Sequence, residues 1–352
     1  ANKKASLMWL RFSPYIDSIA EALQIVMILA GGIFLIKDMI SMGEFIAFSG
    51  LIWTLSNPMR QFGTIINDLQ RFIASAQKII EIYYAKPTIV DRIESIDIPS
   101  RANGDIEFKD VCFKYGNKEV LHNLNFKINA GETVAIMGET GSGKTSLINL
   151  IPRFYDTSKG EVLVDGVNVR MRKLKQLRGN IGMATQDVLL YSDTVDGNIA
   201  YGDTSMSEDE VKGFAKLAAA HDFIEKMPEG YDTIVGERGV GLSGGQKQRI
   251  SLARAMAIRP AILILDDTTS AVDMETEKHI QNSLNNLDFD CTKIIIAQRI
   301  SSTKDADKII ILENGKITDI GSHEELVKKD GYYKDVYTLQ NEGFEKEGDL
   351  VG

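Results

Sequence analysis

A glycine-rich stretch contains the first residues whose types and spacing could do chemistry. The strand-like segment ETVAIMG at 132–138 leads into GETGSGKTSLINLI, which has the pattern of a loop followed by a helix. Such a loop lets bare backbone N–H groups surround phosphates at the N-terminus of a helix. In this spacing Lys144 reaches the outer phosphates, and the Thr145 hydroxyl is offered to Mg²⁺. The nucleotide-binding residues predicted from the stretch are Gly138, Glu139, Thr140, Gly141, Ser142, Gly143, Lys144, Thr145 and Ser146.

Two adjacent aspartates form a second candidate site. The apolar run AILIL at 261–265 predicts a buried strand, and it leads directly into Asp266 and Asp267. Asp266 is suited to holding the Mg²⁺ shell of a P-loop nucleotidase. Asp267 stands where a base could order the attacking water. The pair extends the prediction from nucleotide binding to nucleotide hydrolysis.

The segment GLSGGQKQRISLARA at 241–255 lies between these two motifs. Its LSGGQ, together with the phosphate loop and the apolar strand, resembles the ATP-binding cassette (ABC) transporters, and the resemblance extends over nearly the whole chain. It implies ATP and Mg²⁺ as ligands. It also implies that Ser243, Gly244, Gly245 and Gln246 form a second phosphate-facing loop, which serves the ATP of a partner cassette.

The resemblance assigns further roles by the order of smaller motifs. Tyr115 in CFKYG matches the aromatic residue that stacks on adenine, and Gln186 in MATQD matches the glutamine that links Mg²⁺ to the transmembrane part. Asp273 in SAVD would lie in the loop that crosses the dimer interface, and Glu237 would touch the membrane helices. The implied metal-binding set is Thr145, Gln186 and Asp266. The implied catalytic set is Asp267, Gln298 and Gln186.

Two residues depart from the pattern of the family. Most such exporters have Glu at the position of Asp267 and His at the position of Gln298. Aspartate is one methylene shorter, and a misplacement of about 1 Å can cost on the order of a hundredfold in rate. Glutamine hydrogen-bonds but cannot carry a proton near neutral pH as histidine can. We therefore expect ATP binding to survive and hydrolysis in the chain's own composite site to be slow.

This asymmetry resembles one subunit of a heterodimeric exporter, in which one composite site is degenerate. The intact Ser243–Gln246 loop would then complete the competent site of a second half-transporter. One alternative is a homodimeric lipid or peptide exporter with an active aspartate base. Another is a regulatory ATP-sensing subunit that gates its partner, and a third class is the soluble ABC ATPases.

The elements around these motifs predict two regions. The expected fold is an all-α transmembrane segment followed by an α/β P-loop domain with a helical subdomain. Residues 1–84 would be a partial transmembrane domain, with spans at about 15–36 and 45–66 and a cytoplasmic helical extension. The second span requires a helix that passes through Pro58. Residues 85–104 are predicted to be a linker, 105–340 the nucleotide-binding domain and 341–352 an acidic tail.

The apolar repeat beyond the second span predicts a helical packing seam, formed by Phe62, Ile66, Leu69, Ile73, Ala76, Ile80 and Tyr83. The lysines and arginines flank the two spans and predict that both ends face the cytoplasm, so a multi-pass protein of the cell membrane is expected. Asp17 and Glu21 lie four residues apart in the first span, where they would line a polar cavity or simply meet water at its cytoplasmic end. A half-transporter of the family has six helices, and this sequence contains the last two.

Composition narrows the partners. The net charge of −9 is spread over 352 residues without a basic stripe, which argues against nucleic acid as a partner. Cys112 and Cys291 are far apart and flanked by apolar strand residues, so we expect core positions and neither a disulfide framework nor a zinc site. Ser322 and Glu325 around His323 predict a capping box. The expected partners are membrane lipid and a hydrophobic or amphipathic substrate, whose identity the sequence leaves open.

Overall fold

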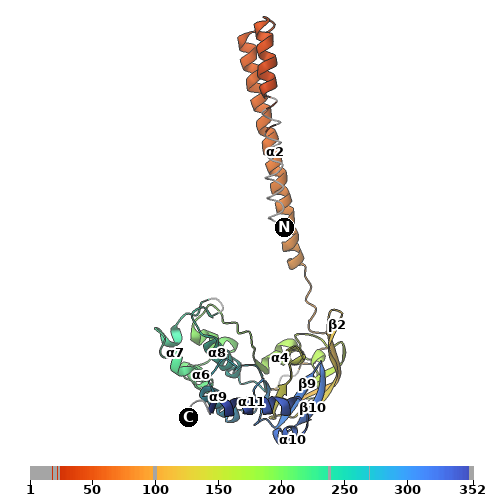
Figure 1. The fold of residues 1–352 in the computed structure, drawn as a ribbon, viewed down its shortest axis with the longest axis vertical. Coiled ribbons are helices and arrows are strands. Elements are labelled where there is room, and N and C mark those ends of the chain that lie inside the picture. Colours follow the sequence, from red (N-terminus) through yellow and green to blue (C-terminus); the bar gives the residue numbers. More distant parts are fainter. Residues whose placement is uncertain are drawn as a thin grey trace. The chain divides into compact units, whose positions relative to one another are not determined.

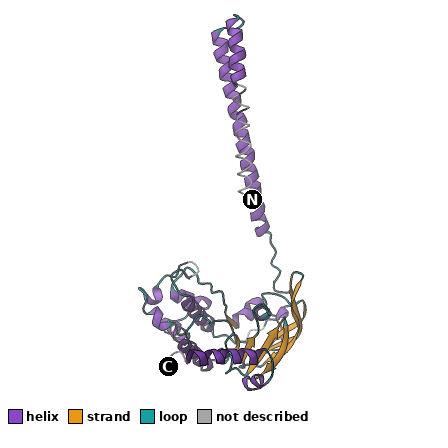
Figure 2. Ribbon diagram, in the orientation of Figure 1, coloured by secondary structure: helices purple, strands orange, loops and turns teal. Residues whose placement is uncertain are grey.

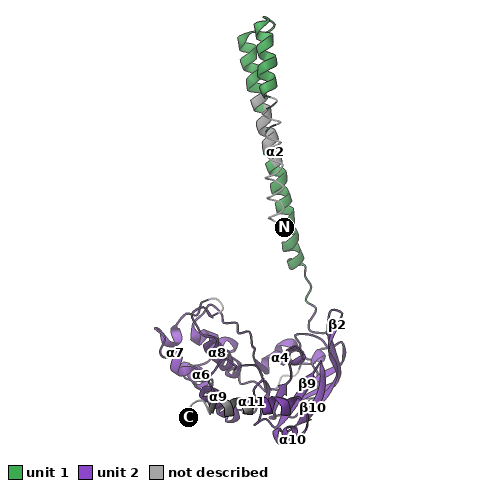
Figure 3. Ribbon diagram, in the orientation of Figure 1, with its two compact units in different colours: residues 1–87 green, residues 88–352 purple. Residues whose placement is uncertain are grey.

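The computed structural model describes residues 18, 22, 24–97, 101–236, 239–268 and 270–348. It divides the chain into two compact units, residues 1–87 and 88–352 (Figure 3). Three residues with predicted roles, Asp17, Glu21 and Glu237, lie outside the described residues.

The first unit contains a helical hairpin. Residues 24–36 are helical, and α2 (Met42–Tyr83) follows after a short turn in which Asp38 adopts a φ of +55° (Figure 1). Ser41 caps α2 in a capping box with Glu44, whose carboxylate accepts from the Ser41 backbone N–H at 2.7 Å. A Cβ atom on Gly31 would lie 2.7 Å from the Phe45 ring. The hairpin therefore depends on a close approach of the two helices at this glycine.

The helix α2 runs without interruption past Pro58 to Tyr83. Five described members of the predicted seam, Ile66, Leu69, Ile73, Ile80 and Tyr83, are exposed. Among the described residues, no helix combines the length and the apolar character that crossing a membrane requires. The spans at about 15–36 and 45–66 stay predictions.

The second unit contains the remaining elements. The strands are β1 (Ile106–Tyr115), β2 (Lys118–Ile128), β3 (Thr133–Met137), β4 (Lys159–Val164), β5 (Val167–Asn168), β6 (Ile181–Ala184), β7 (Ile262–Asp266), β8 (Thr292–Ile296), β9 (Lys308–Glu313) and β10 (Lys316–Gly321). The helices are α3 (Lys144–Leu150), α4 (Leu174–Gly179), α5 (Val195–Ile199), α6 (Glu208–Leu217), α7 (His221–Ile224), α8 (Gly244–Ala257), α9 (Met274–Asn285), α10 (His323–Lys328) and α11 (Tyr332–Gly348).

The strands form two sheets, and the predicted α/β architecture is confirmed. An antiparallel sheet has the order β2-β1-β4-β5, and a six-stranded sheet has the order β10-β9-β3-β8-β7-β6. In the larger sheet only the β9–β10 pair is antiparallel. Every residue of β7 is buried, as expected for a strand covered on both faces. Figure 2 shows most of the strands gathered on one side of the unit, away from helices α6 and α7. Helix α8 lies against β6, where a Cβ atom on Gly182 would lie 2.2 Å from the Ala255 carbonyl oxygen.

The boundary between the units falls inside the segment predicted as a linker. Residues after Pro87 belong to the second unit, and the Ile96 N–H donates to the Met171 carbonyl at 2.7 Å. Asp91 accepts from the Leu174 N–H, also at 2.7 Å. These contacts attach the segment to the chain that leads into α4.

The two cysteines differ in reactivity by burial. Cys291 is 4% exposed, and burial raises the pKa of its thiol to about 11. At pH 8 only about one thousandth of that thiol is ionised, and the thiolate is the nucleophile. Cys112 is half-buried, and its sulfur accepts from the Asn123 N–H at 3.3 Å.

We expect iodoacetamide at pH 8 to alkylate Cys112 in the folded chain and Cys291 only after unfolding in guanidinium chloride. Equal labelling rates in the folded chain, read by peptide mass spectrometry, would contradict this.

Candidate nucleotide-binding site

The parallel strands bring the predicted site residues to one edge of the larger sheet. Asp266 of β7 pairs with Ile296 of β8, and Ile296 in turn pairs with Ile136 of β3. Because parallel strands end at the same edge, the loops that follow them lie beside one another. The phosphate loop follows β3, Gln298 follows β8 and Asp267 follows β7. Gln186 follows β6, the next strand in the sheet.

The phosphate loop is held tightly at both ends. Gly138 has a φ of +150°, and a Cβ atom there would lie 2.0 Å from the Leu312 carbonyl oxygen, so only glycine fits. The Ser142 carbonyl accepts from the Gly315 N–H at 2.9 Å, which ties the loop to the β9–β10 turn. Lys144, at the start of α3, donates to the carbonyls of Gly138 and Glu139, both at 2.7 Å.

Several amides of this loop are available to an anion. Among the described residues, no hydrogen bond engages the backbone N–H groups of Thr140, Gly141 and Gly143. Together with the Lys144 ammonium, these donors fit phosphate oxygens. Burial lowers the pKa of Lys144, whereas the charges of Asp266 and Asp267 oppose that shift.

Asp266 and Thr145 form an oxygen-rich corner beside the loop. The Thr145 hydroxyl donates to Asp266 Oδ2 at 3.1 Å, and Asp266 is 4% exposed. Burial raises the pKa of Asp266; the donated Thr145 hydrogen bond lowers it, and the Asp267 charge raises it further. A carboxylate and a hydroxyl are hard oxygen ligands of the kind Mg²⁺ prefers, so these two side chains fit the metal.

Asp267 occupies a tightly constrained backbone position. Its φ is +52°, and its N–H donates to the Ile296 carbonyl at 3.0 Å. Its own carbonyl accepts from Ser270 Oγ at 3.0 Å and from Gln248 Nε2 at 3.3 Å. Burial raises the pKa of the Asp267 carboxyl, while Ser270, Arg299 and Lys144 lower it. The reach of the short side chain is therefore set by a backbone that is hydrogen-bonded on both sides.

The remaining predicted residues lie at separate places around this edge. Gln186 and Gln298 are exposed, directly after their strands. Tyr115 lies at the end of β1 in the antiparallel sheet, where its ring centroid is 5.1 Å from that of Tyr155 and 4.7 Å from that of Phe113. This aromatic cluster leaves Tyr115 42% exposed, as stacking on a base requires.

The SGGQ segment begins helix α8. Ser243 is its N-cap: its hydroxyl accepts from the Gln246 N–H at 3.3 Å, and its N–H donates to Gln246 Oε1 at 2.9 Å. The exposed glycine is Gly244, whereas Gly245 is buried against Ala271. No hydrogen bond within the described part of the chain joins Ser243 to the phosphate loop. Ser243 of one predicted phosphate-facing segment is thus positioned by its own helix α8 and not by the other segment.

The two central glycines of this segment provide a matched pair of variants. A Cβ atom at position 245 would lie 2.7 Å from the Ala271 carbonyl oxygen, whereas at position 244 the nearest atom is 4.0 Å away. We expect Gly245→Ala to lower the free energy of unfolding by about 1–3 kcal/mol because backbone must move. Gly244→Ala should leave it unchanged or raise it, since alanine favours helix. Thermal unfolding of both variants measures the difference, and equal Tm values would contradict the packing argument.

Four residues of the site region were not predicted from the sequence. Gln248 of α8 contacts the Asp267 carbonyl, and Arg299 donates to the Ser270 carbonyl at 3.3 Å. Glu277 of α9 pairs with Arg299, and Gln340 of α11 hydrogen-bonds the backbone around Gln298. Gln248 lies two residues after Gln246 of the SGGQ segment, so its place beside that segment could have marked it as a site residue. The other three act over distances in the sequence that no local pattern reveals.

Comparison with known proteins gives consistent relatives. The family described as ABC transporter matches residues 121–270. The ATP-dependent lipid A-core flippase of Syntrophus aciditrophicus is 42% identical over 340 residues, which are 97% of this chain and 56% of the flippase. A Bacillus subtilis protein named for multidrug export, YgaD, is 40% identical over 328 residues, which are 93% of this chain and 56% of that protein. The chain therefore spans a little over half the length of these relatives.

Among solved structures, a bacterial Atm1-family ABC exporter with ATP bound is similar to the chain. The TM-score is 0.72 at 32% sequence identity, over 96% of this chain and 59% of the exporter. The similarity thus extends well beyond residues 121–270.

Proposed function

Since the chain belongs to the ABC transporter superfamily through its residues 121–270, we propose that it is the ATP-binding and ATP-hydrolysing part of an exporter subunit. Its own composite site would be slow because of Asp267 and Gln298. Its intact segment Ser243–Gln246 would complete the faster site of a second half-transporter. The observation that carries this proposal is the contrast between a complete phosphate-binding loop and, beside it, a short carboxylate whose backbone is hydrogen-bonded on both sides.

We assign each part of ATP to different residues of the chain. The loop amides and Lys144 hold phosphate oxygens, and the exposed ring of Tyr115 stacks on the base. Thr145, Asp266 and Gln186 would hold Mg²⁺. When bound, Mg²⁺ neutralises the charge that develops on the transferred phosphoryl group. Asp267 orders the attacking water and accepts its proton.

The weakness of this site follows from the backbone at position 267. The Ile296 carbonyl and the donors Ser270 and Gln248 fix both sides of the Asp267 peptide unit. These bonds oppose a shift of the main chain that would make up for the missing methylene. Gln298 cannot transfer a proton near neutral pH, so it does not compensate either.

The proposed transport role rests on the relatives. Their names refer to lipid A-core flipping and to multidrug export, and these substrates are lipidic or drug-like. We propose hydrophobic or amphipathic molecules as the substrate class, and the cell membrane as the location, with residues 105–340 on the cytoplasmic side. The two spans at about 15–36 and 45–66 belong to this proposal.

A single-turnover measurement tests the weakened site. The chain is reconstituted with its partner half-transporter, and ATP hydrolysis per dimer is compared before and after the double change Asp267→Glu with Gln298→His. We expect the double change to add a second hydrolysing site. The same double change with Lys144→Met is the control and should add none.

Other outcomes separate the alternatives. If both sites already hydrolyse equally in the unmodified dimer, Asp267 is a competent base, and a homodimeric exporter replaces the asymmetric one. If the chain binds ATP tightly and the double change adds no hydrolysis, a regulatory ATP-sensing subunit replaces the ATPase.

A further inference from the structure

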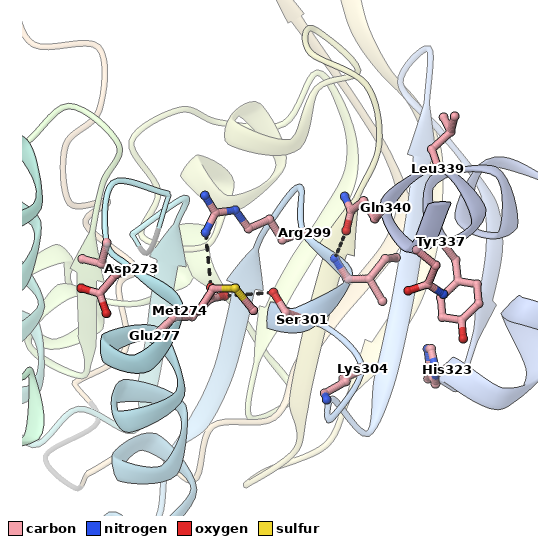
Figure 4. A pocket seen from close by; sticks show the side chains of 13 residues that line it. Asp273, Met274, Glu277, Arg299, Ser301, Lys304, His323, Tyr337, Leu339 and Gln340 are labelled. Carbon is pink, nitrogen blue, oxygen red and sulfur yellow. Dashed lines mark hydrogen bonds and ion pairs between the residues drawn. The ribbon is translucent and has the colours of Figure 1, made fainter. Parts of the chain in front are cut away.

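The turn that presents Gln298 is held by a residue from the other end of the domain. The Gln340 side chain, on α11, donates from Nε2 to the Gln298 carbonyl at 2.9 Å and accepts at Oε1 from the Ile300 N–H, also at 2.9 Å. Figure 4 shows the Gln340 amide facing the turn that contains Arg299. One amide group thus clamps two backbone groups on either side of Arg299.

A second set of contacts fixes the same turn from α9. Arg299 Nη1 lies 3.4 Å from Glu277 Oε2, and Glu277 is 3% exposed. Ser301 also donates to this carboxylate, at 3.4 Å. The buried Glu277 carboxylate thus connects the turn to α9 through Arg299 and Ser301.

Two further hydrogen bonds lead from Arg299 to Asp267, the proposed base. Arg299 Nη2 donates to the Ser270 carbonyl at 3.3 Å, and the Ser270 hydroxyl donates to the Asp267 carbonyl at 3.0 Å. The turn after β8 and the turn after β7 are therefore joined through Arg299. A shift of the Gln340 clamp would be transmitted to both.

The position of Gln340 is set by the docking of α11. Tyr333, in the first turn of α11, is 2% exposed, and its hydroxyl lies 2.7 Å from His323 Nδ1 at the start of α10. Gln340 is itself half-buried, and it lines a pocket of about 810 Å³ together with Glu277, Arg299 and Tyr337. Gln340 is therefore partly accessible from the surface, and the helix that carries it is anchored by a buried tyrosine.

We propose that Gln340 is a positioning residue for ATP hydrolysis: helix α11 sets the backbone of the Gln298 turn through this amide. The inference rests on the proposed function, because it assigns Gln298 and Asp267 to the hydrolytic step. A side-chain amide offers a donor and an acceptor without a change of charge, as these two backbone groups require. Within the described part of the chain, no hydrogen bond joins Gln340 to the phosphate loop, so we expect nucleotide binding not to depend on the clamp.

The test compares Gln340→Met with Leu339→Ala in the full chain reconstituted with its partner half-transporter, with hydrolysis at the partner's own nucleotide site blocked, because the composite site needs both subunits. Methionine keeps the size of glutamine and removes both hydrogen bonds, while Leu339 is an exposed neighbour on the same helix. For Gln340→Met we expect kcat for ATP to fall about tenfold, since small displacements of catalytic groups are costly. The KM for ATP and the Kd for the fluorescent analogue TNP-ATP should stay within about twofold. Leu339→Ala should change none of these values.

Amide hydrogen exchange gives a readout that does not depend on activity. The Ile300 N–H is protected by Gln340, so the peptide around residues 298–303 should exchange faster in Gln340→Met and normally in Leu339→Ala. Unchanged kcat, or parallel losses of kcat, Kd and thermal stability, would overturn the positioning role. If the unmodified dimer binds TNP-ATP at this site but the site does not hydrolyse ATP, the proposed ATPase function fails. Exchange tests the clamp separately: unchanged exchange at Ile300 in Gln340→Met would overturn it.

Discussion

Replacing Lys144 with methionine is expected to slow ATP hydrolysis at the chain's proposed site strongly and to weaken its binding of ATP. The Lys144 ammonium is the cation of the phosphate loop, and it is 9% exposed, near two aspartates that keep it charged against the effect of burial. Its two hydrogen bonds to loop carbonyls also shape the loop that receives the phosphates. Loss of such a preorganised charge typically costs about a hundredfold to a thousandfold in rate. We expect a decrease of that size in hydrolysis and a weaker Kd for TNP-ATP.

The matched control for this prediction is Lys175→Met. Lys175 is an exposed lysine of α4, so its loss should change neither hydrolysis nor binding by more than about twofold. Single-turnover hydrolysis and TNP-ATP titration of both variants give the comparison. Hydrolysis that survives in Lys144→Met at the rate of the control would show that the loop after β3 is not the phosphate site.

The second large effect is expected for Asp266→Asn. The change removes the carboxylate that accepts from Thr145, and with it the charge that would hold Mg²⁺. Hydrolysis should fall by about a hundredfold or more, since charge stabilisation of this kind is a large share of phosphoryl-transfer catalysis. The thermal stability of this variant, in contrast, should stay the same or increase. Because burial raises the pKa of Asp266, ionising this carboxyl costs more in the folded chain than in the unfolded chain, and a neutral isostere relieves that cost.

The sign of the stability change separates this interpretation from simple misfolding. The pKa of Asp266 is raised in the folded chain, so its contribution to stability is present at low pH and is lost as the pH rises through that pKa. At pH 7 the Asn variant should therefore unfold at the same Tm as the unmodified chain or at a higher one. Asp307→Asn is the contrasting control, because Asp307 accepts from the Thr133 N–H at the opposite end of β3. It should lower Tm slightly and leave hydrolysis intact, and a lower Tm for Asp266→Asn than for Asp307→Asn would refute the argument.

The parts of the fold that were predictable are those encoded in short, contiguous patterns. The loop before α3, the fully buried β7 and the capping box of Ser322 with Glu325 all involve residues within a few positions of one another. Their hydrogen bonds are mostly to nearby backbone, so residue type and spacing are sufficient. The alternation of apolar strands with helices likewise predicted the parallel sheet, because such strands need helical connections.

Tertiary structure alone decided which turns share an edge and what holds them. The strand order β3-β8-β7-β6 brings residues 138, 298, 267 and 186 to neighbouring positions, although the sequence order is different. Gln340 reaches a turn about forty residues earlier, and Gln248 reaches Asp267 from a separate helix.

By itself, the sequence of this protein determined the chemistry that its motifs can perform, since types and spacing select phosphate and metal ligands. The sequence also marked Asp267 as a short carboxylate. Only the fold decided that this residue has a backbone hydrogen-bonded on both sides, because the Ile296 carbonyl and the donors Gln248 and Ser270 come from strand pairing, helix docking and the following turn. The contacts with Ile296 and Gln248 join segments that are far apart in the sequence. A local sequence pattern does not reveal them, because they form only when the strands pair and the helices pack on the strands.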